Sequence, residues 1–92
     1  PEYIVADRVN LMVGGIYGDV VVPSLSSSVS LAELAALADA IAASEGFTQL
    51  SLYCSEEAVR ANFSRSFLEE NPNAYDCVLG SWEDGVFTPT PD

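Results

Sequence analysis

The sequence predicts an α+β fold in two layers, with the element order ββαβαββ, a mixed sheet and two helices packed on one face. Apolar residues alternate with more polar ones near both ends of the chain, and two segments between them show helical spacing. Each helical segment lies between strand-like segments, so each is expected to cross over the sheet with a right-handed connection. Residues 1–92 are expected to form a single small acidic domain, with an ordered core at about residues 3–88.

Residues 3–22 are expected to form a β-hairpin. The alternation around Val9 and Leu11 stops at Gly14-Gly15, a pair typical of the turn between two antiparallel strands. The side chains of the second strand are expected on opposite faces, with Ile16, Val20 and Val22 on one and Tyr17, Asp19 and Val21 on the other.

A first helix is expected over residues 31–45. Ser30 is placed to cap its N-terminus, and Glu33 to bond back to it as in a capping box. Gly46 suits the left-handed position that follows the last turn. Helical spacing gives one apolar stripe toward the sheet, made of Leu31, Leu34, Leu37, Ala38 and Ile41.

The opposite side of this helix is rich in alanine and nearly free of charge. Ala36 and Ala40 belong to this side, and their small side chains would let a partner or a second copy of the chain approach closely. The competing interpretation is that alanine is simply the strongest helix former. Both a homodimer contact and a solvated surface are therefore open interpretations of this face.

The second half of the chain predicts a strand over residues 49–54 followed at once by a second helix. Ser55 is the expected N-cap, and Val59, Phe63 and Phe67 recur every four residues as one buried stripe. Two surface ion pairs are expected along this helix, Glu56 with Arg60 and Arg65 with Glu69.

A closing hairpin is expected after Pro72 ends the second helix. Residues 75–82 resume strand character, and Glu83-Asp84-Gly85 is a turn into a last short strand, with Pro89 and Pro91 ending the ordered chain. The large apolar side chains that should be largely buried in this fold are Leu34, Leu37, Ile41, Leu50, Leu52, Phe63, Phe67 and Leu79.

The two cysteines, Cys54 and Cys77, fall within expected strands and are interpreted first as buried thiols. A disulfide between them would require those strands to be neighbours in a suitable register. No Cys-x-x-Cys pair or Cys/His group is present, so no metal site is expected.

No residue pattern for catalysis accompanies this fold. Histidine and lysine are absent, which removes the commonest general base and Schiff-base chemistry on a side chain. A free N-terminal proline such as Pro1 is the base of tautomerase-type enzymes, which the chain resembles at that residue alone. Adjacent carboxylates are interpreted as solvated charge. No catalytic residue and no cofactor are therefore expected.

The location expected from the sequence is the cytoplasm. The apolar segment 31–43 is interrupted by Glu33 and Asp39 and is too short to span a bilayer. No signal-peptide pattern opens the chain, and Pro1 is interpreted as following removal of an initiator methionine.

The charge is the strongest functional signal. The chain has 14 acidic residues and 3 arginines, for a net charge of −11. Such a charge repels nucleic acids and anionic membranes and favours a cationic partner or simple solubility. No direct nucleic-acid or membrane binding is expected.

The leading interpretation is a non-enzymatic protein that binds and inhibits or occludes a basic surface of a protein partner. Small acidic phage proteins that block nucleic-acid-handling defence enzymes share this composition and size. The expected contacts are Asp76, Glu83 and Asp84 around the second hairpin, with Trp82 as an aromatic anchor unless it belongs to the core. The alternative is an assembly module, a homodimer that uses Ala36 and Ala40.

Overall fold

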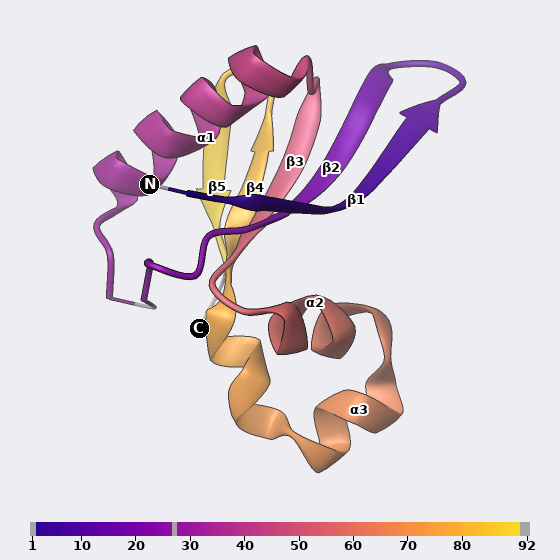
Figure 1. The fold of residues 1–92 in the computed structure, drawn as a ribbon, viewed down its shortest axis with the longest axis vertical. Helices are drawn as coiled ribbons and strands as arrows, with labels where there is room; N and C mark the ends of the chain where they lie inside the picture. The colour runs from indigo at the N-terminus through magenta and orange to yellow at the C-terminus, as the bar shows by residue number, and fades with distance from the viewer. Residues whose placement is uncertain (1, 27, 91–92) are drawn as a thin grey trace.

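The computed structural model describes residues 2–26 and 28–90, which contain a five-stranded mixed sheet with helices (Figure 1). In chain order the elements are β1 (Ile4–Leu11), β2 (Gly15–Val21), α1 (Leu31–Glu45), β3 (Gln49–Tyr53), α2 (Glu56–Phe63), α3 (Arg65–Glu70), the 3₁₀ helix η1 (Pro72–Cys77), β4 (Val78–Glu83) and β5 (Val86–Pro89). The strands lie side by side in this same order, with β2 and β3 parallel and the other neighbours antiparallel. The predicted α+β class with a mixed sheet is confirmed.

The predicted N-terminal hairpin is present as β1 and β2. The chain reverses at Gly14 and Gly15, whose φ angles of 106° and 100° lie in the region that favours glycine. Thr48, just before β3, holds the start of β2, since its Oγ1 donates to the Gly14 carbonyl at 2.6 Å and accepts from the Ile16 N–H at 3.0 Å. The hairpin is thereby attached to its parallel neighbour β3.

The main core lies between α1 and one face of the sheet. The predicted alternation along β2 is confirmed, because Val20 and Val22 face α1 while Val21 packs on the other side. Full burial of one such aliphatic side chain contributes roughly 1.5–3 kcal/mol, so this layer accounts for much of the stability. The buried members of this core are Val20, Val22, Leu34, Ala38, Ile41, Ala42, Phe47, Leu50, Leu52, Cys54 and Leu79.

Helix α1 begins and ends where the sequence predicts. The Ser30 hydroxyl accepts from the Glu33 N–H at 3.2 Å, and Gly46, with φ 74°, donates its N–H to the Ala42 carbonyl at 2.9 Å. Of the predicted stripe, Leu34, Ala38 and Ile41 are buried and Leu37 is half-buried, whereas Leu31 in the first turn is 52% exposed, so its predicted place in the stripe is wrong. No helix within residues 2–26 and 28–90 is long and apolar enough to cross a membrane.

The expectation that both helices pack on one face is wrong. Tyr53 and Val21 point away from α1, and Ala58 of α2 packs against them in a second, smaller core. Figure 1 shows α2 and α3 beyond one end of the sheet, apart from α1. Cys54 and Ser55 alone separate β3 from α2, so this helix starts beside the strand end and cannot reach the α1 face. The chain then returns antiparallel to β3 as β4 rather than crossing over.

The expected single second helix is two helices. Ser64 has extended backbone angles (φ −133°, ψ 110°), and its hydroxyl accepts from the Phe67 N–H at 3.3 Å, so it ends α2 and caps α3. The predicted burial of Phe63 is wrong, because its side chain is 64% exposed; it lies two residues after buried Ala61 and therefore on the outer side of α2. Phe67 is half-buried, and the inward positions of α2 belong instead to Ala58 and Ala61.

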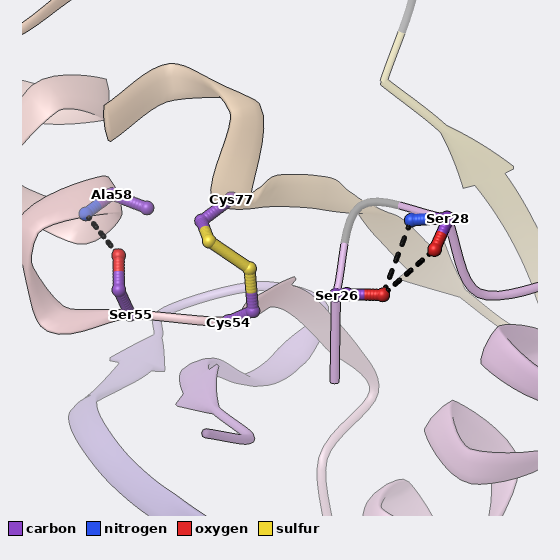
Figure 2. The surroundings of a disulfide bond; sticks show 6 residues. All are labelled: Ser26, Ser28, Cys54, Ser55, Ala58 and Cys77. Atoms are coloured by element: carbon purple, nitrogen blue, oxygen red, sulfur yellow. Dashed lines mark hydrogen bonds between the residues drawn. A yellow bond between two sulfur atoms is a disulfide. The ribbon is translucent and has the colours of Figure 1, made fainter. Parts of the chain in front are cut away.

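The two cysteines form a disulfide, so the interpretation as buried thiols is wrong (Figure 2). Cys54 lies just after β3 and Cys77 ends η1, which replaces the expected strand over residues 75–77. The Cys54 N–H donates to the Cys77 carbonyl at 2.9 Å, which brings the two Cα atoms within 4.8 Å. Ser55 follows directly, and its hydroxyl caps α2 by accepting from the Ala58 N–H at 3.1 Å (Figure 2).

Candidate functional site

The three carboxylates predicted to form one acidic cluster lie in two places. Asp76 is part of η1, before β4, whereas Glu83 ends β4 and Asp84 follows in the turn. The five steps from Val78 to Glu83 span about 17 Å at the usual rise of a strand. The expected single cluster around the second hairpin is therefore wrong in its geometry, since Asp76 belongs to the opposite end of β4.

Trp82 is turned away from the carboxylate next to it. Its half-buried ring packs on the main core, and its Nε1–H donates to the Asp39 carboxylate of α1 at 2.6 Å. Glu83 points to the other face, where its Oε1 accepts from the Gln49 amide at 3.3 Å. Trp82 therefore links β4 to α1, as in the interpretation that placed it in the core.

Ala36 and Ala40 lie on the outer side of α1. Both are exposed, together with Ala32 and Ala43. The prediction that they point away from the core is confirmed, and the alanine face is accessible to solvent or to another molecule.

The acidic surface is little neutralised by arginine. The ion pair among the described residues joins Arg8 Nη2 to Glu45 Oε1 at 2.6 Å, and Arg8 also lies 4.7 Å from the centre of the Phe47 ring. Arg60 instead stacks 4.1 Å from the centre of the Phe67 ring, and the pairs predicted for Arg60 and Arg65 are not present. The exposed carboxylates among the described residues are Glu2, Asp7, Glu33, Asp39, Glu56, Glu57, Glu69, Glu70, Asp76, Glu83 and Asp84.

An apolar groove lies beside Asp76, between the start of α1, η1 and β5. It encloses about 830 Å³, and Asp76 is the charged residue among the side chains that line it. Leu31 and Tyr75 are 52% and 39% exposed there, although both are large and apolar. The remaining lining residues are Val29, Leu34, Val78, Leu79, Thr88, Pro89 and Thr90. Sequence patterns could not indicate this groove, because its walls come from three distant segments.

A polar cluster lies on the face of the sheet opposite α1. Asp19 is 1% exposed, and its Oδ1 accepts from the Tyr17 hydroxyl at 2.8 Å and from the Tyr53 hydroxyl at 2.9 Å. Asn62 of α2 donates to the Tyr53 hydroxyl at 3.1 Å, and Ser51 and Tyr17 share a hydrogen bond of 2.7 Å. The cluster thus joins β2, β3 and α2 through one carboxylate.

Burial sets the protonation of this cluster. It raises the pKa of Asp19 above its ordinary value; the two tyrosine hydroxyls oppose the shift by donating to the carboxylate, and repulsion from Asp7 adds to it. Burial likewise raises the pKa of Tyr17 and of Tyr53, and the neighbouring Asp19 charge reinforces both shifts. The hydroxyls therefore stay protonated donors at neutral pH.

The cluster is a connection between elements rather than an open site. The functional atoms of Asp19 and Tyr53 are buried, so a substrate has no access to them. The sequence placed Tyr17 and Asp19 on one face, but it carried no signal for Asn62, which reaches them only through the position of α2. Among residues 2–26 and 28–90, no three carboxylate or cysteine side chains gather as a metal site would require.

Comparisons of the chain with protein-family models, curated proteins and solved structures found no match. No relative therefore assigns a role to the groove, the acidic surface or the polar cluster.

Proposed function

We propose that this chain is a non-enzymatic acidic protein that binds and occludes a basic surface of a protein partner. The observation that carries this proposal is the groove beside Asp76. Exposed Leu31 and Tyr75 supply apolar area, and a carboxylate stands at their edge within a surface of net charge −11. Protein interfaces combine an apolar centre with a polar rim in this way.

In this proposal the charge and the groove contribute to different steps of binding. Carboxylates without arginine partners raise the rate at which a cationic surface is encountered, and they repel nucleic acid and anionic membranes. The groove then holds an apolar side chain of the partner and slows its release. A phage-type inhibitor of a nucleic-acid-handling defence enzyme is the kind of protein that this combination suits.

The compartment follows from the state of Cys54 and Cys77. The sequence-based expectation is the cytoplasm, where thiols are normally kept reduced, whereas the disulfide favours an oxidising compartment. We propose a cytoplasmic location only if Cys54 and Cys77 are free thiols in the cells that make the protein. Alkylation of the freshly extracted protein followed by mass measurement distinguishes the two states.

The proposed function is tested by capturing partner proteins at increasing ionic strength. Variants of the chain distinguish the contribution of the charge to binding from that of the groove. Wild type is compared with Asp76→Asn, Leu31→Ser and Glu69→Gln, where Glu69→Gln removes the same charge from the exposed surface of α3. A specific partner should be lost as ionic strength rises, should be weakened by both groove variants and should be retained by Glu69→Gln. Capture that is independent of salt and equal for all variants would rule the proposal out.

The assembly module remains the second candidate because Ala36 and Ala40 are exposed on the outer side of α1. In that proposal two copies pack these faces together, and the charge serves solubility alone. A dimer that is indifferent to salt would favour it.

A further inference from the structure

The sheet ends in two edges of different character. β5 is short and ends at Pro89, which has no N–H to offer, while β1 runs over the 8 residues from Ile4 to Leu11. Its register with β2 is regular from Asp7 to Leu11 and shifts between Val5 and Asp7. The free edge able to pair with another strand is therefore the second half of β1.

The backbone groups that face this edge can be assigned. Ile16 directs its N–H and its C=O toward Thr48, so it does not use them for Asn10, its direct neighbour in β1. In an antiparallel pair, the opposite residue then points its own N–H and C=O away from the partner strand. Asn10 therefore offers both groups to the edge, and by alternation so does Arg8.

Asp7 already occupies part of this edge. Its Oδ1 accepts from the Arg8 N–H at 2.9 Å, the position that the carbonyl of an added strand would take. Asp7 also lies directly across from Asp19 in β2, and like charges facing one another across strands are unfavourable. The Arg8 side chain does not relieve this, because its guanidinium is bound to Glu45 on the other face. Among the described residues, no arginine forms an ion pair with Asp7.

Exposed apolar side chains lie between this carboxylate and the hairpin tip. Val9 shares the face of Asp7 and is partly exposed, and the hairpin tip that follows carries Met12 and Val13, which are almost wholly exposed. This exposed apolar area is available for contact with another molecule.

We infer that the β1 edge binds an extended segment of a partner protein that carries a cationic residue between apolar ones. The segment adds as a sixth strand, and one of its carbonyls accepts from the Arg8 N–H. The Asp7 carboxylate then turns to the cationic side chain, and apolar neighbours cover Val9 and the hairpin tip. A segment without a cation leaves Asp7 crowded and unpaired, so this residue selects the partner. A second copy of the chain is a poor occupant because each copy carries a charge of −11.

This inference concerns a surface distinct from the groove beside Asp76, so either can fail without the other. The test uses the full chain and a synthetic peptide of alternating valine and threonine with one central lysine, followed by nuclear magnetic resonance of the backbone amides. Two matched peptides serve as controls. One carries glutamine in place of the lysine, and the other has methylated backbone nitrogens. The chain variants are Asp7→Asn and, as the control with the same loss of charge, Asp84→Asn.

The lysine peptide should shift the Arg8 and Asn10 amide signals and slow their hydrogen exchange. The glutamine peptide should bind up to about fivefold more weakly, the effect of one cross-strand charge pair. Asp7→Asn should remove that preference, and Asp84→Asn should keep it. The inference is overturned if the methylated peptide binds equally, if the perturbed amides lie elsewhere, or if no binding occurs at the solubility limit. A dimer joined at β1 in sedimentation would likewise overturn it in favour of a second copy.

Discussion

The hydroxyl of Tyr53 donates a 2.9 Å hydrogen bond to the carboxylate of Asp19 across the parallel strands β2 and β3. Both side chains are buried, at 0% and 1% exposure. The bond ties the centre of the sheet to α2, because Asn62 donates to the same hydroxyl. The energy of this connection depends on whether Asp19 carries a charge.

Asp19→Asn should change how stability depends on pH. Burial raises the folded-state pKa of Asp19, so its contribution is fully present below the unfolded-state pKa and is lost as the pH rises through the folded-state pKa. Of the groups that face it, Asp7 adds repulsion, while Tyr17 and Tyr53 remain neutral donors. Asparagine does not titrate, so the Tm of the variant should improve relative to wild type as the pH rises from the ordinary aspartate pKa of about 3.9 through the raised folded-state pKa of Asp19.

The absolute stability of Asp19→Asn tests this account less well than the change of its Tm with pH does. The amide group adds a buried donor, whose lack of a partner costs about 1–3 kcal/mol at every pH. Asp84→Asn, at an exposed turn position, is the control for loss of one carboxylate. Melting curves of Asp19→Asn and wild type that stay parallel across this pH range would contradict the account of the buried carboxylate.

Phe63→Ala should barely affect stability, although helical spacing alone placed this residue in the core. Its side chain is 64% exposed, so the loss should stay below about 1 kcal/mol. Leu52→Ala, at a fully buried position in β3, should cost about 2–5 kcal/mol. Denaturant unfolding of both variants is the measurement, and a loss of similar size for the two would mean that Phe63 is buried, as its helical spacing predicts.

Opening the disulfide should destabilise the chain by about 3 kcal/mol, the value expected for a loop of this length. Cys54 and Cys77 are 23 residues apart in the sequence, and their bond fixes η1 to the end of β3. The measurement is unfolding of the Cys54→Ser, Cys77→Ser variant beside the oxidised protein. Equal stability would show that η1 is held by its other contacts alone.

Replacing Ala36 and Ala40 by glutamate should leave the fold intact, because both residues are exposed and glutamate is a good helix former. If α1 mediates self-association or partner binding, that contact should be lost, since charge in a packed interface is costly. Sedimentation mass, partner binding and Tm are measured together. Unchanged mass and binding in a folded variant would remove the alanine face from consideration.

Local signals allowed α1 and both hairpins to be predicted. Ser30 and Gly46 define the ends of α1 through contacts within a few residues, and Gly14-Gly15 marks the first turn by its backbone freedom alone. The break at Ser64 was missed because serine inside a helical pattern is compatible with both a continued helix and a cap.

Features that depend on distant segments could not be predicted in this way. The disulfide needs the end of β3 beside η1, and the groove needs the start of α1 beside Tyr75 and β5. The acidic residues were evident in the sequence, but their separation into two groups follows from the length of β4. The periodicity of the sequence predicts the face of a strand or helix on which a side chain lies. Its neighbours from distant segments are known only from the packed structure.

The groove also separates the predicted contact residues into two testable groups. Asp76→Asn changes the groove, whereas Glu83→Gln with Asp84→Asn changes the distant turn between β4 and β5. If the turn supports binding only through long-range attraction, the double variant should lower the association rate at low ionic strength and leave the dissociation rate unchanged. A faster dissociation rate would instead place this turn within the contact.

The most direct test of the proposed function is the association rate of a captured partner as a function of ionic strength, measured for wild type, Asp76→Asn and Glu69→Gln. Wild type should associate more slowly as salt increases, because exposed charges are screened. Asp76→Asn should lower the rate at low salt and flatten this dependence, while Glu69→Gln, which removes the same charge from α3 outside the groove, should have a much smaller effect. Identical curves for all three proteins, or a rate that does not depend on salt, would contradict binding of a basic surface at the groove.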